Sequence, residues 1–154
     1  MSNFLSLLGW LAASFAAAAL GGFATARSVT TWYATLNKPS WNPPGWVFGP
    51  VWTALYIGMA VAMWLVWKSG SPVRNTAAGL FVTQLVLNAL WSWLFFGWHR
   101  PGPAAVEIVV LWVVILATTL VFARASGLAA GLMIPYLAWV AFASFLNFTI
   151  WRLN

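Results

Sequence analysis

Residues 32–56 read WYATLNKPSWNPPGWVFGPVWTALY, and this stretch sets the interpretation of the whole chain. It holds four tryptophans and four prolines, namely Trp32, Trp41, Trp46, Trp52, Pro39, Pro43, Pro44 and Pro50. Proline fixes φ and lacks an amide hydrogen, so the segments around Pro39 and Pro43 are excluded from regular helix. A disordered linker would not carry so many aromatic rings. We therefore predict a folded cap, because long loops in compact domains usually form lids or binding loops.

Composition places the chain in a membrane. Of its 154 residues, 63% are hydrophobic and 5% are charged, whereas soluble domains carry about 25% charged residues. The net charge of +6 comes from single basic residues at the ends of apolar runs, which is typical of interface anchors and not of a nucleic-acid-binding surface. The absence of cysteine excludes disulfides, thiolate catalysis and zinc–sulfur sites.

Five apolar runs are long enough to cross a bilayer, which takes about 20 residues each. They cover residues 3–25, 46–67, 76–98, 103–124 and 128–151, with the cap at 26–45. Spans in lipid must pair their backbone groups internally, so these runs predict helices. The chain is thus expected to be an all-α, multi-pass integral membrane protein with one domain over 1–154. The first three residues lack the charge of a signal peptide, so the first run should be retained.

The first run carries small residues spaced four apart at Gly9, Ala13, Ala17 and Gly21. Such a stripe lets another helix approach closely. Two partners fit this pattern, a helix of the same bundle or the same face of a second copy in a homodimer.

The third run presents Gln84, Asn88, Trp91 and Phe95 at spacings of three and four. Amides inside a span are costly unless they are paired. This stripe fits either hydrogen bonds between helices or one wall of a ligand cavity.

The fifth run contains Pro135, which predicts a kink or a displaced helix start. Tyr136, Trp139, Ala143 and Asn147 share one of its faces. The small Ala143 between two larger side chains suits either a close helix contact or the floor of a pocket.

Glu107 is the only acidic residue of the chain. An acid inside a span is a functional candidate. A structural role is the alternative, because Glu107 follows a helix N-terminus and Arg100 is near enough in sequence to pair with it.

The chain has few residues that could carry out conventional catalysis. One histidine, one glutamate and no cysteine exclude a multi-ligand metal site, a catalytic triad and a carboxylate pair, so no cofactor is expected. The 13 tryptophans instead offer flat apolar faces with one N–H donor each. They favour a flat polycyclic ligand, such as a metal-free porphyrin or a sterol-like molecule. Because indole is oxidisable, a bound porphyrin could also undergo light-driven chemistry.

Four motifs resemble the TspO/MBR family, which includes the tryptophan-rich sensory proteins and the mitochondrial translocator protein. They are W-Y-x-x-L-x-K-P-x-W-x-P-P at 32–44, W-x-x-L-Y at 52–56, Q-L-x-L-N-x-x-W-S-x-L-F-F-G at 84–97 and P-Y-L-A-W-V-x-F-A-x-x-L-N at 135–147. They lie in order and together span nearly the whole chain.

The resemblance implies a five-helix bundle, usually a homodimer, that binds porphyrins, sterols and benzodiazepine-type ligands under the loop between its first two helices. The matching pocket residues here are Tyr33, Trp41, Pro43, Trp52, Tyr56, Asn88, Trp91, Phe95, Trp139, Ala143 and Leu146. Trp32 and Trp139 match tryptophans that the family links to light-dependent porphyrin breakdown. The alternative is that both residues only shape the pocket.

The family's sterol motif falls on Leu146, Phe148 and Arg152, with Phe148 in the place of a tyrosine. The missing hydroxyl weakens the case for sterol recognition but leaves porphyrin binding unaffected. The resemblance thus implies a tetrapyrrole-linked sensor or regulator. A transporter of porphyrins or other amphipathic molecules is the alternative, although no internal repeat supports alternating access.

Overall fold

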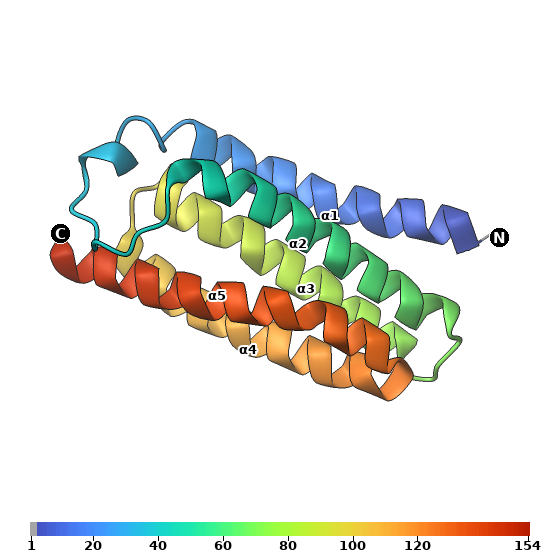
Figure 1. Ribbon diagram of the computed structural model, residues 1–154. Helices are drawn as coiled ribbons and strands as arrows, with labels where there is room; N and C mark the ends of the chain where they lie inside the picture. The colour runs from blue at the N-terminus through green and yellow to red at the C-terminus, as the bar shows by residue number, and fades with distance from the viewer. Residues whose placement is uncertain (1–2) are drawn as a thin grey trace.

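The computed structural model describes residues 3–154, which form a bundle of five helices without strands in that range (Figure 1). The helices are α1 (Asn3–Ala26), α2 (Gly45–Lys68), α3 (Arg74–Ser92), α4 (Pro101–Ala125) and α5 (Gly127–Leu153). A π-helical turn, η2 (Trp93–Gly97), continues α3, and a short 3-10 helix, η1 (Tyr33–Thr35), interrupts the segment between α1 and α2. Five helices are long and apolar enough to cross a membrane, so the predicted all-α, five-span membrane protein is confirmed.

Four of the five helices begin one or two residues before the sequence-based boundaries. The fourth helix begins at Pro101 and not at Pro103, because proline suits a first helical position where no amide hydrogen is needed. α2 begins at Gly45, so Pro50 lies in its second turn. α5 runs through Pro135 as one uninterrupted helix.

The bundle is packed most densely in the half away from the cap. Met59, Met63, Phe81, Ile115 and Phe122 are all fully buried there. α4 and α5 run antiparallel and are joined at two levels, where Trp112 Nε1 donates to the Leu137 carbonyl at 3.0 Å and Asn147 Nδ2 donates to the Pro101 carbonyl at 2.8 Å. The buried core is therefore concentrated away from the cap, and α4 and α5 are joined both near mid-length and at the cap end.

The small-residue stripe of α1 packs within the protomer over part of its length. Ala17 and Gly21 are buried, and a Cβ at Gly21 would lie 2.9 Å from the Ser92 hydroxyl oxygen on α3. Gly9, at the other end, is exposed. A homodimer contact through this face stays a prediction.

Glu107 does not pair with Arg100. Neither carboxylate oxygen has a hydrogen-bond partner among residues 3–154, although both oxygens are buried. Arg100 precedes α4 and is exposed, whereas Glu107 lies about 10 Å further along the helix axis. Glu107 and Arg100 therefore lie in different environments.

Gly97 provides a stability test of the π-helical turn. An alanine Cβ there would lie 2.6 Å from Cε3 of Trp93, whose Nε1 donates to the Leu20 carbonyl at 3.0 Å and so ties α3 to α1. We expect Gly97→Ala to displace this indole and to lower the free energy of unfolding by about 1–3 kcal/mol. Thermal unfolding in detergent measures the effect.

Gly79→Ala on the exposed side of α3 is the matched control, because nothing in the described chain lies within 4 Å of its added Cβ. It should leave stability unchanged or slightly raised, since alanine is the better helix former. Equal melting temperatures for both variants would contradict the proposed role of Gly97.

Candidate ligand-binding cavity

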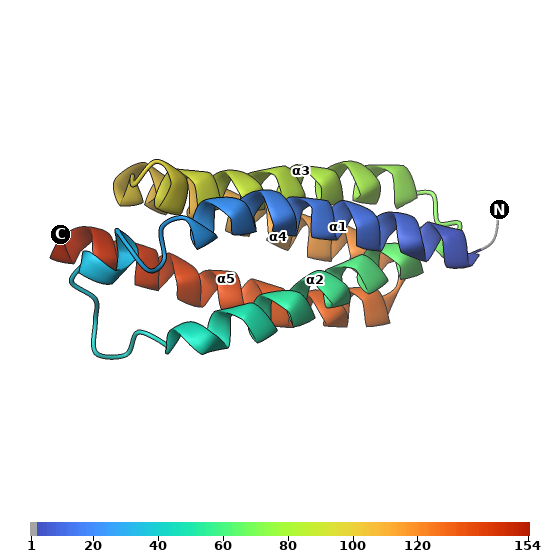
Figure 2. The same ribbon diagram turned by 90° about the horizontal axis from the view of Figure 1, so that it is seen from above.

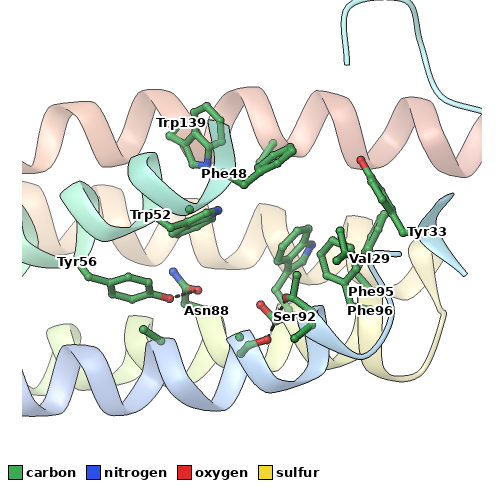
Figure 3. A pocket seen from close by; sticks show the side chains of 18 of the residues that line it. Val29, Tyr33, Phe48, Trp52, Tyr56, Asn88, Ser92, Phe95, Phe96 and Trp139 are labelled. Atoms are coloured by element: carbon green, nitrogen blue, oxygen red, sulfur yellow. Dashed lines mark hydrogen bonds between the residues drawn. The ribbon is translucent and has the colours of Figure 1, made fainter. Parts of the chain in front are cut away.

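A cavity of about 630 Å³ lies between α1, α2, α5 and the α3–η2 segment, at the cap end of the bundle (Figure 3). Its volume falls within the range of about 300–1,000 Å³ that is usual for small-molecule sites. The structure places these predicted residues on its wall: Tyr33, Trp52, Tyr56, Asn88, Trp91, Phe95, Trp139, Ala143 and Leu146.

Three predicted residues lie elsewhere. Trp41 is 47% exposed and packs edge-on against Phe142, with ring centroids 5.8 Å apart. Pro43 is not on the cavity wall, and Trp32 stands behind Phe95, one ring removed from the cavity at 5.8 Å. The cap therefore reaches the cavity through Val29 and Tyr33 and not through its tryptophans.

The sequence reasoning missed the wall that α1 contributes. Ala18, Gly22 and Ala26 line the cavity at spacings of four, one position beyond the predicted small-residue stripe of α1. Side chains this small carry no chemical signal of their own. Their repeated spacing is the feature that could have revealed them.

A chain of hydrogen bonds forms the floor of the cavity. Tyr56 donates to Asn88 Oδ1 at 3.0 Å, Asn88 Nδ2 donates to the Tyr136 oxygen at 2.7 Å, and Tyr136 donates to Gln84 Oε1 at 2.6 Å. These residues join α2, α3 and α5 in the membrane interior, where an unpaired polar group is costly. Asn88 thus bonds between helices and also faces the cavity, which combines the two alternatives that its spacing left open.

The π-helical turn builds the wall at the cap end. Phe95 and Phe96 are consecutive residues, and both face the cavity, an arrangement that a local change of helical pitch makes possible. Their ring centroids lie 4.8 Å apart, and Tyr33 packs on Phe96 at 5.3 Å. Trp91 is fixed beside them because its Nε1 donates to Asn147 Oδ1 at 2.8 Å. Figure 3 shows the rings of Tyr33, Phe95 and Phe96 together at one end of the cavity.

The cap is held by its own polar contacts. Tyr33 donates to Asn42 Oδ1 at 3.1 Å, and Lys38 Nζ donates to the Tyr33 and Leu36 carbonyls at 3.0 and 3.1 Å. Burial raises the pKa of the Tyr33 phenol, which keeps it a hydrogen-bond donor at neutral pH.

The C-terminal end of α5 also grips the cap. Asn37 donates its backbone N–H to Asn154 Oδ1 at 3.0 Å, and Asn154 Nδ2 donates to the Asn37 carbonyl at 2.9 Å. The side-chain amide thus pairs with both backbone groups of one cap residue.

His99 forms a further clasp between the cap and the bundle. Its ring lies flat on Trp32, with centroids 4.3 Å apart and planes 9° apart, and its Nε2 lies 3.3 Å from the hydroxyl oxygen of the buried Ser28. The residue adopts a φ of 56°, a left-handed conformation that is uncommon outside glycine. A strained backbone persists only where surrounding contacts hold it.

Most polar groups on the cavity wall are already paired within the protein. Trp139 Nε1 is buried and has no hydrogen-bond partner among residues 3–154. Trp139 faces Trp52 edge-on, with centroids 6.5 Å apart. None of the described lining residues is charged. The cavity can therefore hold a flat, uncharged body against aromatic side chains.

The structure divides the predicted sterol motif. Leu146 is buried on the cavity side, whereas Phe148 is 50% exposed and Arg152 is exposed on the outside of α5. Two positions correspond to about 200° around a helix, so Leu146 and Phe148 face opposite ways. In residues 3–154, no group of three or more His, Cys, Asp or Glu residues could hold a metal ion.

The clasp at His99 can be tested with His99→Asn. Asparagine tolerates the left-handed backbone but removes the ring stacked on Trp32. An aromatic pair contributes about 0.5–1.5 kcal/mol, so amide exchange over residues 28–37 should accelerate about two- to tenfold. Hydrogen–deuterium exchange mass spectrometry reads this directly. Arg100→Asn is the neighbouring control, and equal exchange in both variants would show that the stack does not secure the cap.

The chain matches known proteins along nearly its whole length. The model of the TspO/MBR family matches residues 10–152. The chain is 48% identical to the tryptophan-rich protein TspO of Chlorobaculum tepidum, over 87% of this chain and 86% of that protein. It is 41% identical to the protein of the same name from Archaeoglobus fulgidus, over 99% of both, and 43% identical to the Homo sapiens translocator protein, over 90% and 86%. The chain belongs to the TspO/MBR family of integral membrane proteins.

Proposed function

We propose that the protein binds a metal-free porphyrin such as protoporphyrin IX in this cavity and acts as a tetrapyrrole-linked sensor or regulator. The observation that carries the proposal is the pair of indoles at Trp52 and Trp139, which face an uncharged cavity of about 630 Å³. Large flat rings gain most from apolar contact with other flat rings.

The charged groups of such a ligand need a place outside the cavity. Burying a carboxylate without a partner is costly, and the described wall carries no cation. Arg27 directly follows the lining residue Ala26 at the end of α1 and is exposed. We therefore place the porphyrin carboxylates at the cavity mouth near Arg27.

Transport is the second candidate, and it is favoured by the name of the Homo sapiens relative, translocator protein. The packing favours a binding protein. Beneath the floor at Tyr56 and Asn88, Met59, Met63 and Phe81 are fully buried, so crossing the membrane would require the floor and core to open. A sterol site on α5 is not proposed, because Leu146 and Phe148 face opposite sides of the helix.

Binding can be tested by titrating the detergent-solubilised protein with protoporphyrin IX and following the quenching of tryptophan fluorescence. Trp52→Ala and Trp139→Ala should each weaken affinity at least about tenfold, since each removes a large contact surface. Trp46→Ala is the control, because Trp46 is 77% exposed and lies off the cavity wall. Unchanged affinity in the first two variants would place the binding site elsewhere.

We further propose that bound porphyrin is degraded slowly in light. The excited macrocycle takes one electron from an indole, which leaves a porphyrin radical anion and an indole radical cation. Molecular oxygen then adds across one carbon–carbon double bond of the ring, and the electron returns to the indole. The net change breaks that bond and forms two C=O groups, with one O2 consumed. The main contribution of the protein is to hold the ring against the indole. Trp139 stands on the cavity wall, whereas Trp32 is separated from it by Phe95. The alternative is that both tryptophans only shape the site and that bleaching is incidental.

At matched porphyrin occupancy and equal illumination, Trp139→Phe should slow the decay of porphyrin absorbance more than Trp32→Phe. Phenylalanine keeps most of the apolar surface but is much harder to oxidise. Removing oxygen should stop product formation in every sample. Equal rates and products in wild type and both variants would leave a binding protein without photochemical activity.

A further inference from the structure

The exposed part of the cavity wall lies on two helices only. All described lining residues that are exposed belong to α1 or α2, namely Phe15, Ala19, Gly22, Ala26, Gly45, Gly49 and Thr53. The lining residues of α3, η2 and α5 are buried or half-buried. The cavity therefore opens between α1 and α2, and we call this opening the slot.

The slot lies within the membrane-spanning part of the chain. Its two edges belong to Asn3–Ala26 and Gly45–Lys68, both long and apolar enough to cross a bilayer. Figure 2 shows α1 and α2 diverging towards the end that carries the cap. In the described structure, a Cβ added at Gly22, Gly45 or Gly49 would meet no atom within 4 Å, so these edges border open space.

Compared with the slot, the route into the cavity through the cap is obstructed. Tyr33, Phe95 and Ile150 are buried at that end of the cavity, and Phe96 packs on Tyr33. The cap itself is fastened through Asn154 and through the His99 stack. A ligand arriving from water would have to break these contacts, whereas one dissolved in the bilayer would meet small apolar side chains.

We propose that the cavity takes its ligand sideways from the hydrocarbon of the bilayer, through the slot between α1 and α2. The inference rests on the proposed porphyrin-binding function. It narrows the ligand class to flat molecules whose apolar body partitions into the membrane. Carboxylates at one edge of such a molecule remain at the interface, where Arg27 ends the α1 edge of the slot. The bilayer concentrates the ligand and orients it before binding.

The first test changes the edges of the slot. Gly22→Leu and Gly49→Leu place bulk there, and leucine is a better helix former than glycine, so folding is not impaired. Ala16→Leu and Ala54→Leu are matched controls, because both alanines are exposed on the same helices but do not line the cavity. In lipid vesicles preloaded with protoporphyrin IX, the slot variants should take it up and release it at least tenfold more slowly than the controls.

The second test separates access from a filled cavity. Because the chain has no cysteine, Gly22→Cys combined with Gly49→Cys allows a reversible bis-methanethiosulfonate cross-link across the slot. Protein cross-linked when empty should fail to take up protoporphyrin IX, protein cross-linked when loaded should retain it, and a reductant should restore exchange.

Unchanged rates of protoporphyrin IX exchange after verified cross-linking would refute entry through the slot. Faster exchange in His99→Asn, together with normal rates in the slot variants, would assign access to the cap instead. Wild-type protein that shows no binding at equilibrium would refute the proposed function and this inference with it. If the protein binds normally at equilibrium and the slot variants exchange protoporphyrin IX at unaltered rates, only entry through the slot would be refuted.

Discussion

The structure depends on the hydrogen-bonded chain from Tyr56 through Asn88 and Tyr136 to Gln84. Hydrocarbon supplies no partner for a polar side chain, so each of these groups must be satisfied by another helix. The chain fixes α2, α3 and α5 at one level of the membrane. On one side of this level the bundle packs densely around Met59 and Met63, and on the other side it encloses the cavity.

The cap end follows from a different constraint, the shortage of regular structure in a proline-rich segment. Tyr33, Lys38 and Asn42 stabilise this segment with their own hydrogen bonds, and His99 and Asn154 fasten it to the bundle. The π-helical turn completes the wall by turning two phenylalanines inwards. Together these features close the end of the cavity and leave its α1–α2 side open.

Much of this arrangement was predictable from sequence because bilayers impose strong patterns. Apolar runs gave five helices, and the periodicity of Asn88, Trp91 and Phe95 placed them on one wall. The cap resisted prediction, since a segment without a period does not reveal which of its rings face inwards, and Trp41 faces outwards. The stack of Trp32 on His99 joins residues distant in sequence, and no local pattern encodes such a contact.

The central claim is that a flat ligand lies in the cavity against Trp52 and Trp139, above the polar floor. A structure of the protein in lipid with protoporphyrin IX tests it most directly. The account predicts density for the macrocycle within the cavity, in contact with Trp52 and Trp139, and for the carboxylates at the α1–α2 opening. Density for the ring on the outer face of α5, against Phe148 and Arg152, with the cavity empty, would contradict it.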